Sequence, residues 1–261
     1  MERKLIWLDF DAIPGPFRTL LEGTDVYDSS CSQEARVFFL DRDGGLFLKM
    51  APRGSLEKEA AMARFFCQKG LSSQVLAYES LDKDWLLTAR VPGEDCVWGP
   101  YLENPEKLCD TTAQLLRQLH ETDRAGCPVP DRTADYLAAA ARNYDQGTYD
   151  ATSFPDSFGY GSAEEAWGVL EKHSHLLKAD TLLHGDYCLP NIILKDWRLS
   201  GFIDLGCGGV GDRHIDLFWG TWTLWFNLKT DRYRERFLDA YGRWDVEPEM
   251  LRVVAAAEVF G

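Results

Sequence analysis

The sequence lacks the cysteine pattern of a disulfide-stabilised or zinc-binding protein. Its 261 residues include seven cysteines, which is an odd number, and no two of them form a CxxC pair. Disulfide frameworks and structural zinc sites both depend on paired or regularly spaced cysteines. We therefore expect reduced thiols and a cytoplasmic location.

Long apolar segments and an excess of basic residues are also missing. No apolar run approaches the roughly 20 residues that span a bilayer, and the N-terminal residues MERKLIWLDFDAIPG lack the apolar core of a signal peptide. Lys and Arg number 28 against 42 Asp and Glu, so the formal net charge is -14. Such a surface repels nucleic acid and anionic membranes and favours cationic partners, although many proteins are acidic for solubility alone. We expect neither nucleic acid nor a membrane as a partner, and the sequence leaves the oligomeric state open.

The order of the expected elements indicates two lobes. Strand-like residues at 35–40 and 45–50, and again at 74–79 and 84–91, predict two hairpins, with a helix over 56–70 between them. After the hinge-like stretch VPGED (91–95), helical spacing dominates and short strands interrupt it. The sequence thus predicts an α+β fold with an N-terminal antiparallel sheet lobe carrying one helix, over residues 1–91, and a larger, mainly helical lobe over residues 92–261.

Two short motifs in the second half carry the chemistry. HGDYCLPN places Asp186 and Asn191 five residues apart, and DLG follows with Asp204. Phosphoryl transfer to an alcohol needs a carboxylate that orients the hydroxyl and hard oxygen ligands for magnesium. The spacing is that of the kinase catalytic loop, and DLG corresponds to its DFG. We expect Asp186 to be the catalytic carboxylate and Asn191 and Asp204 to bind Mg²⁺.

The stretch HGDYCLPNIILKDWRLSGFIDLG resembles the core of the aminoglycoside phosphotransferase family, most closely its 3'-phosphotransferase branch. FLKM, WLLTARVPGEDC, LLRQLH and GDRHID extend the resemblance from about residue 30 to the C-terminus. It implies a bilobal, protein-kinase-like fold that binds ATP or GTP with Mg²⁺ between its lobes. It also implies transfer of the γ-phosphoryl group to a hydroxyl of an aminoglycoside antibiotic, which confers resistance.

The resemblance assigns residues to the nucleotide phosphates. Lys49 matches the lysine that holds them, and Glu59 matches its ion-pair partner. We favour Glu59 over Glu57 because Glu59 would share a helix face with the apolar Leu56 and Ala63. An inward-facing carboxylate needs a cation, which Lys49 would provide.

Four other residues are expected at the nucleotide. Phe47 stands where the family often stacks an aromatic ring on adenine, and Ala89 and Val91 match the hinge positions whose backbone binds the base. Ser32 falls near the tip of the phosphate-covering loop, although this loop lacks the GxGxxG of protein kinases.

On the acceptor side the sequence departs from the family pattern. Cys207 stands where an Arg commonly follows DLG, and Ala257 replaces an Asp of the acidic C-terminal tail. The tail keeps Glu258, and the insertion loop YDATSFPDSF keeps Asp150 and Asp156. We expect these three carboxylates to bind a small, hydroxylated and cationic acceptor, with the loop acting as a lid.

Alternatives follow from these departures. One is a related kinase for another hydroxylated metabolite or antibiotic, and another is an inactive nucleotide-binding protein. The run LFWGTWTLWFNL places Trp219, Trp222 and Phe226 at helical spacing. We interpret it chiefly as core or inter-helix packing, and alternatively as an aromatic wall of the acceptor pocket. His184 and Asp216 are expected to brace the catalytic loop rather than to react.

Overall fold

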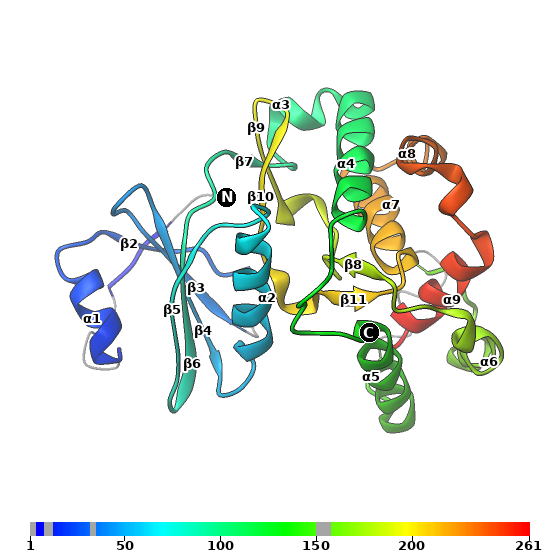
Figure 1. The fold of residues 1–261 in the computed structure, drawn as a ribbon, viewed down its shortest axis with the longest axis horizontal. Helices are drawn as coiled ribbons and strands as arrows, with labels where there is room; N and C mark the ends of the chain where they lie inside the picture. The colour runs from blue at the N-terminus through cyan, green and yellow to red at the C-terminus, as the bar shows by residue number, and fades with distance from the viewer. Residues whose placement is uncertain (1–3, 8–12, 32–34, 150–157) are drawn as a thin grey trace. The chain divides into compact units, whose positions relative to one another are not determined.

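The computed structural model describes residues 4–7, 13–31, 35–149 and 158–261, which fold into two compact units (Figure 1). The first unit is Met1–Pro92 together with Ser200–Gly206, and the second is Gly93–Leu199 together with Cys207–Gly261. The short segment Ser200–Gly206 carries Asp204, so this residue belongs to the first unit, whereas Asp186 and Asn191 belong to the second.

An antiparallel sheet forms most of the first unit. Its strands follow the order β1-β2-β3-β4-β6-β5. Their bounds are β1 Lys4–Leu5, β2 Val26–Asp28, β3 Arg36–Leu40, β4 Leu46–Pro52, β5 Val75–Ser80 and β6 Lys83–Ala89. The two expected hairpins are β3–β4 and β5–β6, and both are confirmed.

Alternation along β4 decides which face of the sheet carries Lys49. Leu46 and Leu48 are buried with Phe17 of helix α1 (Gly15–Leu21), whereas Lys49 and Ala51 have the opposite parity. Ala51 packs with residues of helix α2 (Glu57–Gln68), so Lys49 lies on the α2 face of the sheet. Figure 1 shows α1 and α2 on opposite faces. Helix α1 is an addition to the single helix expected in this lobe.

Helix α2 has no side-chain cap of its own at its first turn. Instead, the buried carboxylate of Asp84 on β6 accepts the backbone N–H of Leu56 at 2.8 Å, immediately before the helix. The helix ends at Gln68, and Gly70 follows as the expected C-terminal glycine, with φ of 73° in the left-handed conformation that glycine adopts readily. The sheet therefore fixes the start of the helix that presents Glu59.

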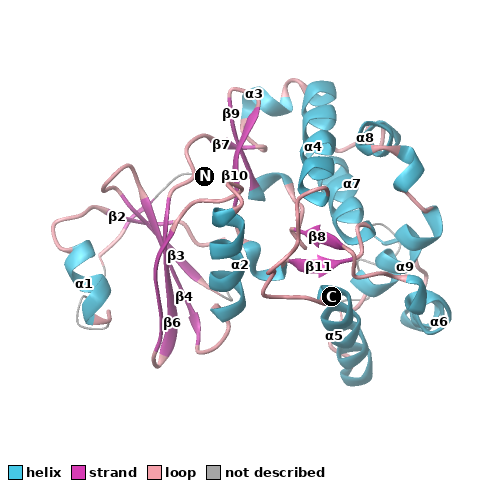
Figure 2. Cartoon of the chain, viewed as in Figure 1, coloured by secondary structure: helices cyan, strands magenta, loops and turns pink. Residues whose placement is uncertain are grey.

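The second unit is mainly helical, with short strands between its helices (Figure 2). Its helices are α3 Gly99–Leu102, α4 Pro105–His120, α5 Arg132–Gln146, α6 Ala163–His173, α7 His214–Leu228, α8 Arg234–Tyr241 and α9 Pro248–Glu258. Its strands are β7 Glu94–Asp95, β8 Thr181–Leu183, β9 Ile192–Lys195 and β11 Gly209–Gly211, and β10 Arg198–Phe202 leads back into the first unit. Short 3₁₀ turns are η4 Ser174–Leu176, η5 Leu189–Asn191, η6 Leu205–Cys207 and η7 Arg243–Asp245. The expected α+β architecture is confirmed.

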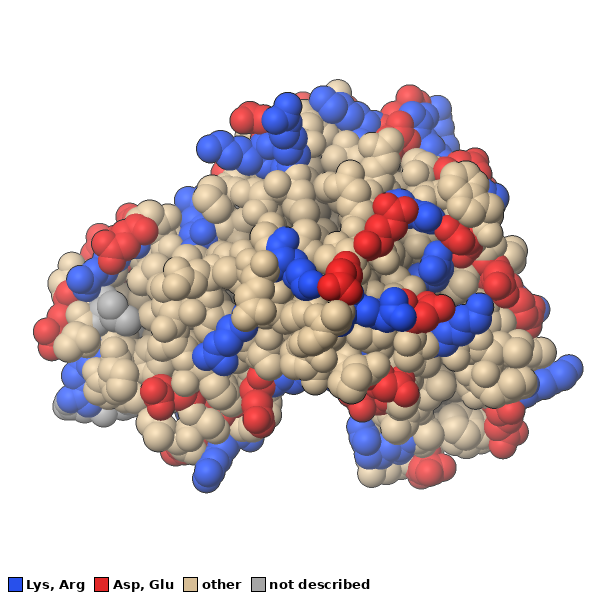
Figure 3. Space-filling view, viewed as in Figure 1, with Lys and Arg blue, Asp and Glu red and all other residues tan. Residues whose placement is uncertain are grey.

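The described helices and surface agree with the composition. No helix in the described part of the chain is long and apolar enough to cross a membrane. On the face drawn in Figure 3, acidic and basic side chains stand beside one another rather than forming one basic patch. The described cysteines form no disulfide.

Candidate active site

Within the first unit, Lys49 is held by two carboxylates. Its Nζ lies 2.8 Å from Glu59 Oε2 and 2.8 Å from Asp204 Oδ1. The structure thus brings together Lys49, Glu59 and Asp204, which are three of the residues expected at the nucleotide. Asp204 adopts a left-handed backbone with φ of 58°, and its side chain is 52% exposed, so the carboxylate remains accessible.

The charge of Lys49 is stabilised by this arrangement. Burial alone would lower the pKa of Lys49, but the carboxylates of Glu59 and Asp204 raise it above its ordinary value. Burial raises the pKa of Glu59, and the Lys49 charge acts in the opposite direction. Lys49 therefore stays protonated throughout the physiological range, as its expected role at the phosphates would require.

Within the second unit, Asn191 fixes the position of Asp186. The Asn191 amide nitrogen donates to Asp186 Oδ2 at 2.8 Å and to the Asp186 carbonyl at 3.1 Å. Both partners are acceptors, so the amide must present its NH₂ group to them. Its oxygen is then the atom that could bind a cation. Turn η5 places Asn191 here, with Pro190 at a position where a missing N–H costs nothing.

Glycine is required in the middle of HGD. Gly185 has φ of 83°, and a Cβ there would lie 1.8 Å from the carbonyl oxygen of Cys207. The residue after DLG therefore touches the catalytic loop through its backbone. The same carbonyl accepts a hydrogen bond from Arg132 Nε at 2.8 Å. A guanidinium from α5 thus lies at Cys207, where the family pattern has an Arg, and no sequence signal near DLG predicts it.

Asp216 braces the loop, as its motif predicts. It is fully buried, and its two oxygens accept the backbone N–H groups of His184 at 2.8 Å and Gly185 at 2.7 Å. His184 is itself fully buried, and its Nδ1 accepts the Asp186 N–H at 3.3 Å. Neither residue is exposed to a substrate, which agrees with a bracing role for both.

Glu258 is more enclosed than a simple surface carboxylate. Its Oε1 accepts hydrogen bonds from the Tyr136 hydroxyl at 2.8 Å and from Trp219 Nε1 at 2.9 Å. Burial raises the pKa of Glu258 to about 7, and the charge of Asp186 contributes to this rise. Asp186 and Glu258 therefore lie within electrostatic reach of each other in the second unit.

The aromatic run on α7 lies at the edge of the core. Trp222 stacks on Phe226 at 4.9 Å and meets Trp219 edge-on at 5.3 Å. Phe226 is 47% exposed, whereas Leu224 and Thr221 on the other side of the helix are buried. The interpretation of this run as core packing is wrong for Phe226, whereas Trp219 and Trp222 are partly buried, and the three rings form an aromatic stripe along one side of α7.

The three residues expected to contact the nucleotide base lie in different environments. Phe47 is half-buried on β4, on the same face as Lys49, and its ring lies 5.3 Å from that of Phe39. The Ala89 N–H donates to the Gln74 carbonyl at 2.9 Å, so it is already occupied within the sheet. Val91 is buried. The expected roles of these three residues toward a base stay predictions.

Three expected site residues cannot be placed. Ser32, Asp150 and Asp156 lie outside the described residues, as does most of the expected lid.

Cys188 and Cys207 flank the site. Burial and the neighbouring Asp186 raise the pKa of the Cys188 thiol, so this side chain is neutral rather than a nucleophile.

The donor set suits a hard cation better than a transition metal. No cluster of three or more His, Cys, Asp or Glu side chains within the described ranges could hold a metal alone. Magnesium usually takes only one or two protein ligands and completes its shell with phosphate oxygens and water. Each unit offers one oxygen ligand of this kind: the accessible carboxylate of Asp204 in the first, and the amide oxygen of Asn191 in the second.

Comparison with known proteins supports the same chemistry. The pattern that defines the phosphotransferase enzyme family matches residues 30–253 of the chain. A probable aminoglycoside 3'-phosphotransferase from Lactococcus lactis subsp. lactis (strain IL1403) is 44% identical over 259 residues, covering 99% of this chain and 98% of that protein.

Solved structures agree in fold. The crystal structure of an aminoglycoside 3'-phosphotransferase of type VIII aligns with a TM-score of 0.73 and 27% identity, covering 94% of this chain and 97% of that one. A Streptomyces rimosus aminoglycoside phosphotransferase, solved with ADP and streptomycin, aligns with a TM-score of 0.68 and 23% identity, covering 87% and 91%. The chain therefore belongs to the phosphotransferase enzyme family, as an enzyme resembling the aminoglycoside 3'-phosphotransferases.

Proposed function

We propose that this enzyme transfers the γ-phosphoryl group of ATP to a hydroxyl of an aminoglycoside, at the 3' position as its relatives' names state. The observation that carries the phosphotransferase part is Lys49 held at 2.8 Å by both Glu59 and Asp204. The acceptor part rests on the relative that is 44% identical over nearly the whole chain. Such an activity in the cytoplasm would inactivate the antibiotic and confer resistance.

Each residue has a definite task in this proposal. Lys49 neutralises phosphate charge, and Glu59 keeps its ammonium group in place. Asp204 and Asn191 would hold Mg²⁺, which neutralises phosphate charge and orients the phosphate oxygens when it is bound. GTP would serve the same chemistry, because the phosphates rather than the base react.

Asp186 orients the acceptor hydroxyl and receives its proton. The Asn191 amide holds one carboxylate oxygen at 2.8 Å, which fixes the direction of the carboxylate. Direct transfer needs no covalent enzyme intermediate, because positioning and charge neutralisation supply most of the rate enhancement.

A neutral hydroxylated acceptor is the alternative to a cationic one. A cationic acceptor would pair with Glu258, whereas a neutral hydroxylated compound would pack against the aromatic stripe of Trp222 and Phe226. The two neutral donors on Glu258 Oε1 and its half-titrated state near neutral pH give the rival some support.

A panel of acceptors tests the proposal directly. Purified enzyme, radiolabelled ATP and Mg²⁺ are incubated with kanamycin-like aminoglycosides, with analogues lacking the 3'-hydroxyl, and with neutral hydroxylated antibiotics. We expect labelled product only from acceptors that carry the 3'-hydroxyl, and raised resistance in bacteria that express the enzyme. Product from neutral compounds alone would establish the rival, and no product from any acceptor would refute the proposal.

The metal ligands predict a graded loss of nucleotide binding. Asp204→Asn keeps the size and the left-handed backbone but removes the charge, so the Kd for Mg-ATP should rise about tenfold. Asn191→Ala should raise it less, about threefold, because a carboxamide coordinates without neutralising the ion. Calorimetry with and without EDTA measures both effects. Glu59→Gln is the control, since it removes the other carboxylate of Lys49 without removing a metal ligand. Equal Mg-ATP binding by Asp204→Asn and wild type would remove Asp204 from the metal site.

Glu258 predicts a pH-dependent acceptor affinity. Because its pKa lies at about 7, the carboxylate is mostly neutral at about pH 6 and mostly charged at about pH 8. The KM of a cationic acceptor should therefore fall as pH rises through this range in wild type. Glu258→Gln should raise that KM about tenfold at the upper pH and hardly at the lower one, with the KM for ATP unchanged.

Folding stability supplies an independent check on the same group. A glutamate whose pKa is raised in the folded state stabilises the fold at low pH, and this stability is lost as pH rises from about 4.5 through about 7. The Gln variant should lack that loss in urea titrations. Glu249→Gln, a change at a partly exposed carboxylate in the first turn of the same helix, is the control. Parallel pH profiles of KM in wild type and Glu258→Gln would exclude Glu258 from acceptor binding.

A further inference from the structure

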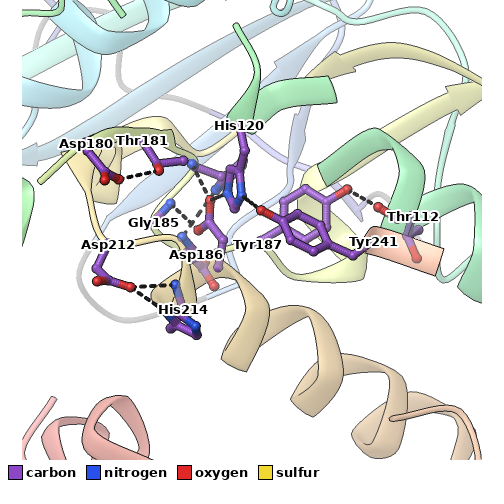
Figure 4. Close-up of polar contacts among 12 residues, drawn as sticks. Thr112, His120, Asp180, Thr181, Gly185, Asp186, Tyr187, Asp212, His214 and Tyr241 are labelled. Atoms are coloured by element: carbon purple, nitrogen blue, oxygen red, sulfur yellow. Dashed lines mark hydrogen bonds and ion pairs between the residues drawn. The ribbon is translucent and has the colours of Figure 1, made fainter. Parts of the chain in front are cut away.

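A chain of buried polar groups leads from the catalytic loop to helix α8. Asp216 accepts the amides of His184 and Gly185, and Asp216 Oδ2 also lies 3.2 Å from His120 Nε2. The other ring nitrogen of His120 lies 2.8 Å from the Tyr241 hydroxyl. Figure 4 shows His120 with dashed contacts to Tyr241 on one side and, on the other, to the carboxylate that receives the Gly185 amide.

The hydrogen-bond partners determine which atom carries the proton at each contact of this network. Asp216 can only accept, so His120 Nε2 carries the proton and Nδ1 accepts from the Tyr241 hydroxyl. Burial lowers the pKa of His120 despite the nearby Asp216, which keeps the ring neutral. Asp216 then has three donors: His120 and the amides of His184 and Gly185. A fully buried carboxylate needs such a set, because each missing donor leaves charge uncompensated.

Tyr241 is itself held from its outer side. The Arg117 guanidinium lies 5.5 Å from the centre of the Tyr241 ring and forms an ion pair with Asp245, and Arg213 lies 3.4 Å from the same Asp245 carboxylate. Tyr241 ends α8, and Asp245 ends η7 directly after it. The Tyr241 ring is therefore held by Arg117 of α4, and Arg117 is in turn held by Asp245 of η7. Both elements lie far from the catalytic loop in the sequence.

We propose that His120 and Tyr241 are positioning residues for phosphoryl transfer: through Asp216 they hold the His184–Gly185 peptide, and with it the Asp186 carboxylate, in its reactive place. This proposal rests on the proposed function. The loop has little other freedom, because Gly185 already lies against the Cys207 carbonyl and cannot shift toward it. A small rotation of the Asp216 carboxylate would move both amides together, and displacement of a catalytic group by about 1 Å can cost about a hundredfold in rate.

Substitutions separate positioning from general packing. His120→Leu removes both hydrogen bonds of the ring, and it should lower kcat about ten- to a hundredfold while the KM values for ATP and acceptor change less than about threefold. His120→Gln can still donate to Asp216, so it should restore kcat to within about fivefold of wild type. Tyr241→Phe removes only the hydroxyl and should lower kcat about three- to tenfold.

The matched control is Tyr160→Phe. Tyr160 is also a buried tyrosine, and its hydroxyl donates to the Arg252 carbonyl at 2.6 Å, outside this network. It should lose stability to a similar degree as Tyr241→Phe without losing kcat. Equal losses of kcat in both Phe variants would show a general packing effect and overturn the proposal.

A readout without substrate distinguishes failure of this proposal from failure of the proposed function. Amide hydrogen exchange of Gly185 should be slow in wild type and about tenfold faster in His120→Leu and Tyr241→Phe. If no acceptor is phosphorylated but exchange accelerates, the bracing stands and the assigned reaction falls. If His120→Leu does not fold, the Gln and Phe variants carry the test. Unchanged exchange and kcat in the variants that fold would overturn the proposal.

Discussion

Asp186→Asn should lower kcat about a thousandfold, because a positioned general base contributes roughly 10²- to 10⁴-fold to such a reaction. The change keeps the shape of the side chain and removes its capacity to take a proton. The Kd for Mg-ATP should stay within about threefold of wild type, since Asp186 is assigned to the hydroxyl rather than to the nucleotide. Initial rates with saturating acceptor, and calorimetry with ATP, measure the two quantities.

Asp180→Asn is the matched control for this variant. Asp180 is exposed just before β8, and its carboxylate accepts only a local hydrogen bond from Thr181 at 2.8 Å among the contacts described. It should retain full turnover. If Asp186→Asn turned over at a near-wild-type rate, Asp186 would have no part in the chemistry, whatever its place in the motif.

Asp84→Ala should cost about 2–4 kcal/mol of folding free energy, as expected for removing a buried carboxylate that satisfies several donors. The carboxylate receives the Leu56 N–H at 2.8 Å, the Ser80 hydroxyl at 2.6 Å and the Tyr78 hydroxyl at 3.1 Å. The first turn of α2 would lose its anchor, so the Lys49–Glu59 pair should loosen and the Kd for Mg-ATP should rise. Urea unfolding monitored by fluorescence measures the loss of stability.

The pH dependence of this loss has a definite sign. Burial alone would raise the pKa of Asp84, but hydrogen bonds from Ser80, Gly54 and Leu56 lower it below its ordinary value. The stability it contributes is therefore present above about pH 3.8 and disappears as pH falls through the lower, folded-state pKa. The exposed neighbour Asp82 provides the control variant Asp82→Ala, which should change stability by less than about 0.5 kcal/mol. A loss below about 1 kcal/mol for Asp84→Ala would show that another group anchors α2.

Local sequence patterns were sufficient to predict the motifs and most of the helices and strands. HGDYCLPN and DLG are short, so spacing alone predicts the groups that they present, and the alternation of β4 explains why Lys49 faces α2. The residues that sequence missed have distant partners. Asp84 binds Leu56 across 28 positions, and His120 reaches Asp216 across 96 and Tyr241 across 121. The local spacing of apolar and polar residues carries no information on such distant hydrogen-bonded pairs.

The other feature that the sequence did not predict is which face of a helix is buried. Helical spacing correctly groups Trp219, Trp222 and Phe226, but it does not say whether that face is buried. The surroundings of Glu258 were likewise not predicted: we expected this carboxylate at the acceptor, and the structure buries it against Tyr136 and Trp219. Both facts depend on how helices pack together, which is decided by the whole fold.

The return of Ser200–Gly206 to the first unit has a consequence for dissecting the protein. A fragment cut at Pro92 would lack Phe202, whose ring packs edge-on against Phe66 at 6.3 Å and whose N–H donates to the Leu71 carbonyl at 2.8 Å. It would also leave Lys49 with one carboxylate instead of two. The sheet lobe is therefore not a portable module: its core and its ionic site are completed by a peptide encoded more than a hundred residues downstream, so truncations and domain exchanges must carry both segments.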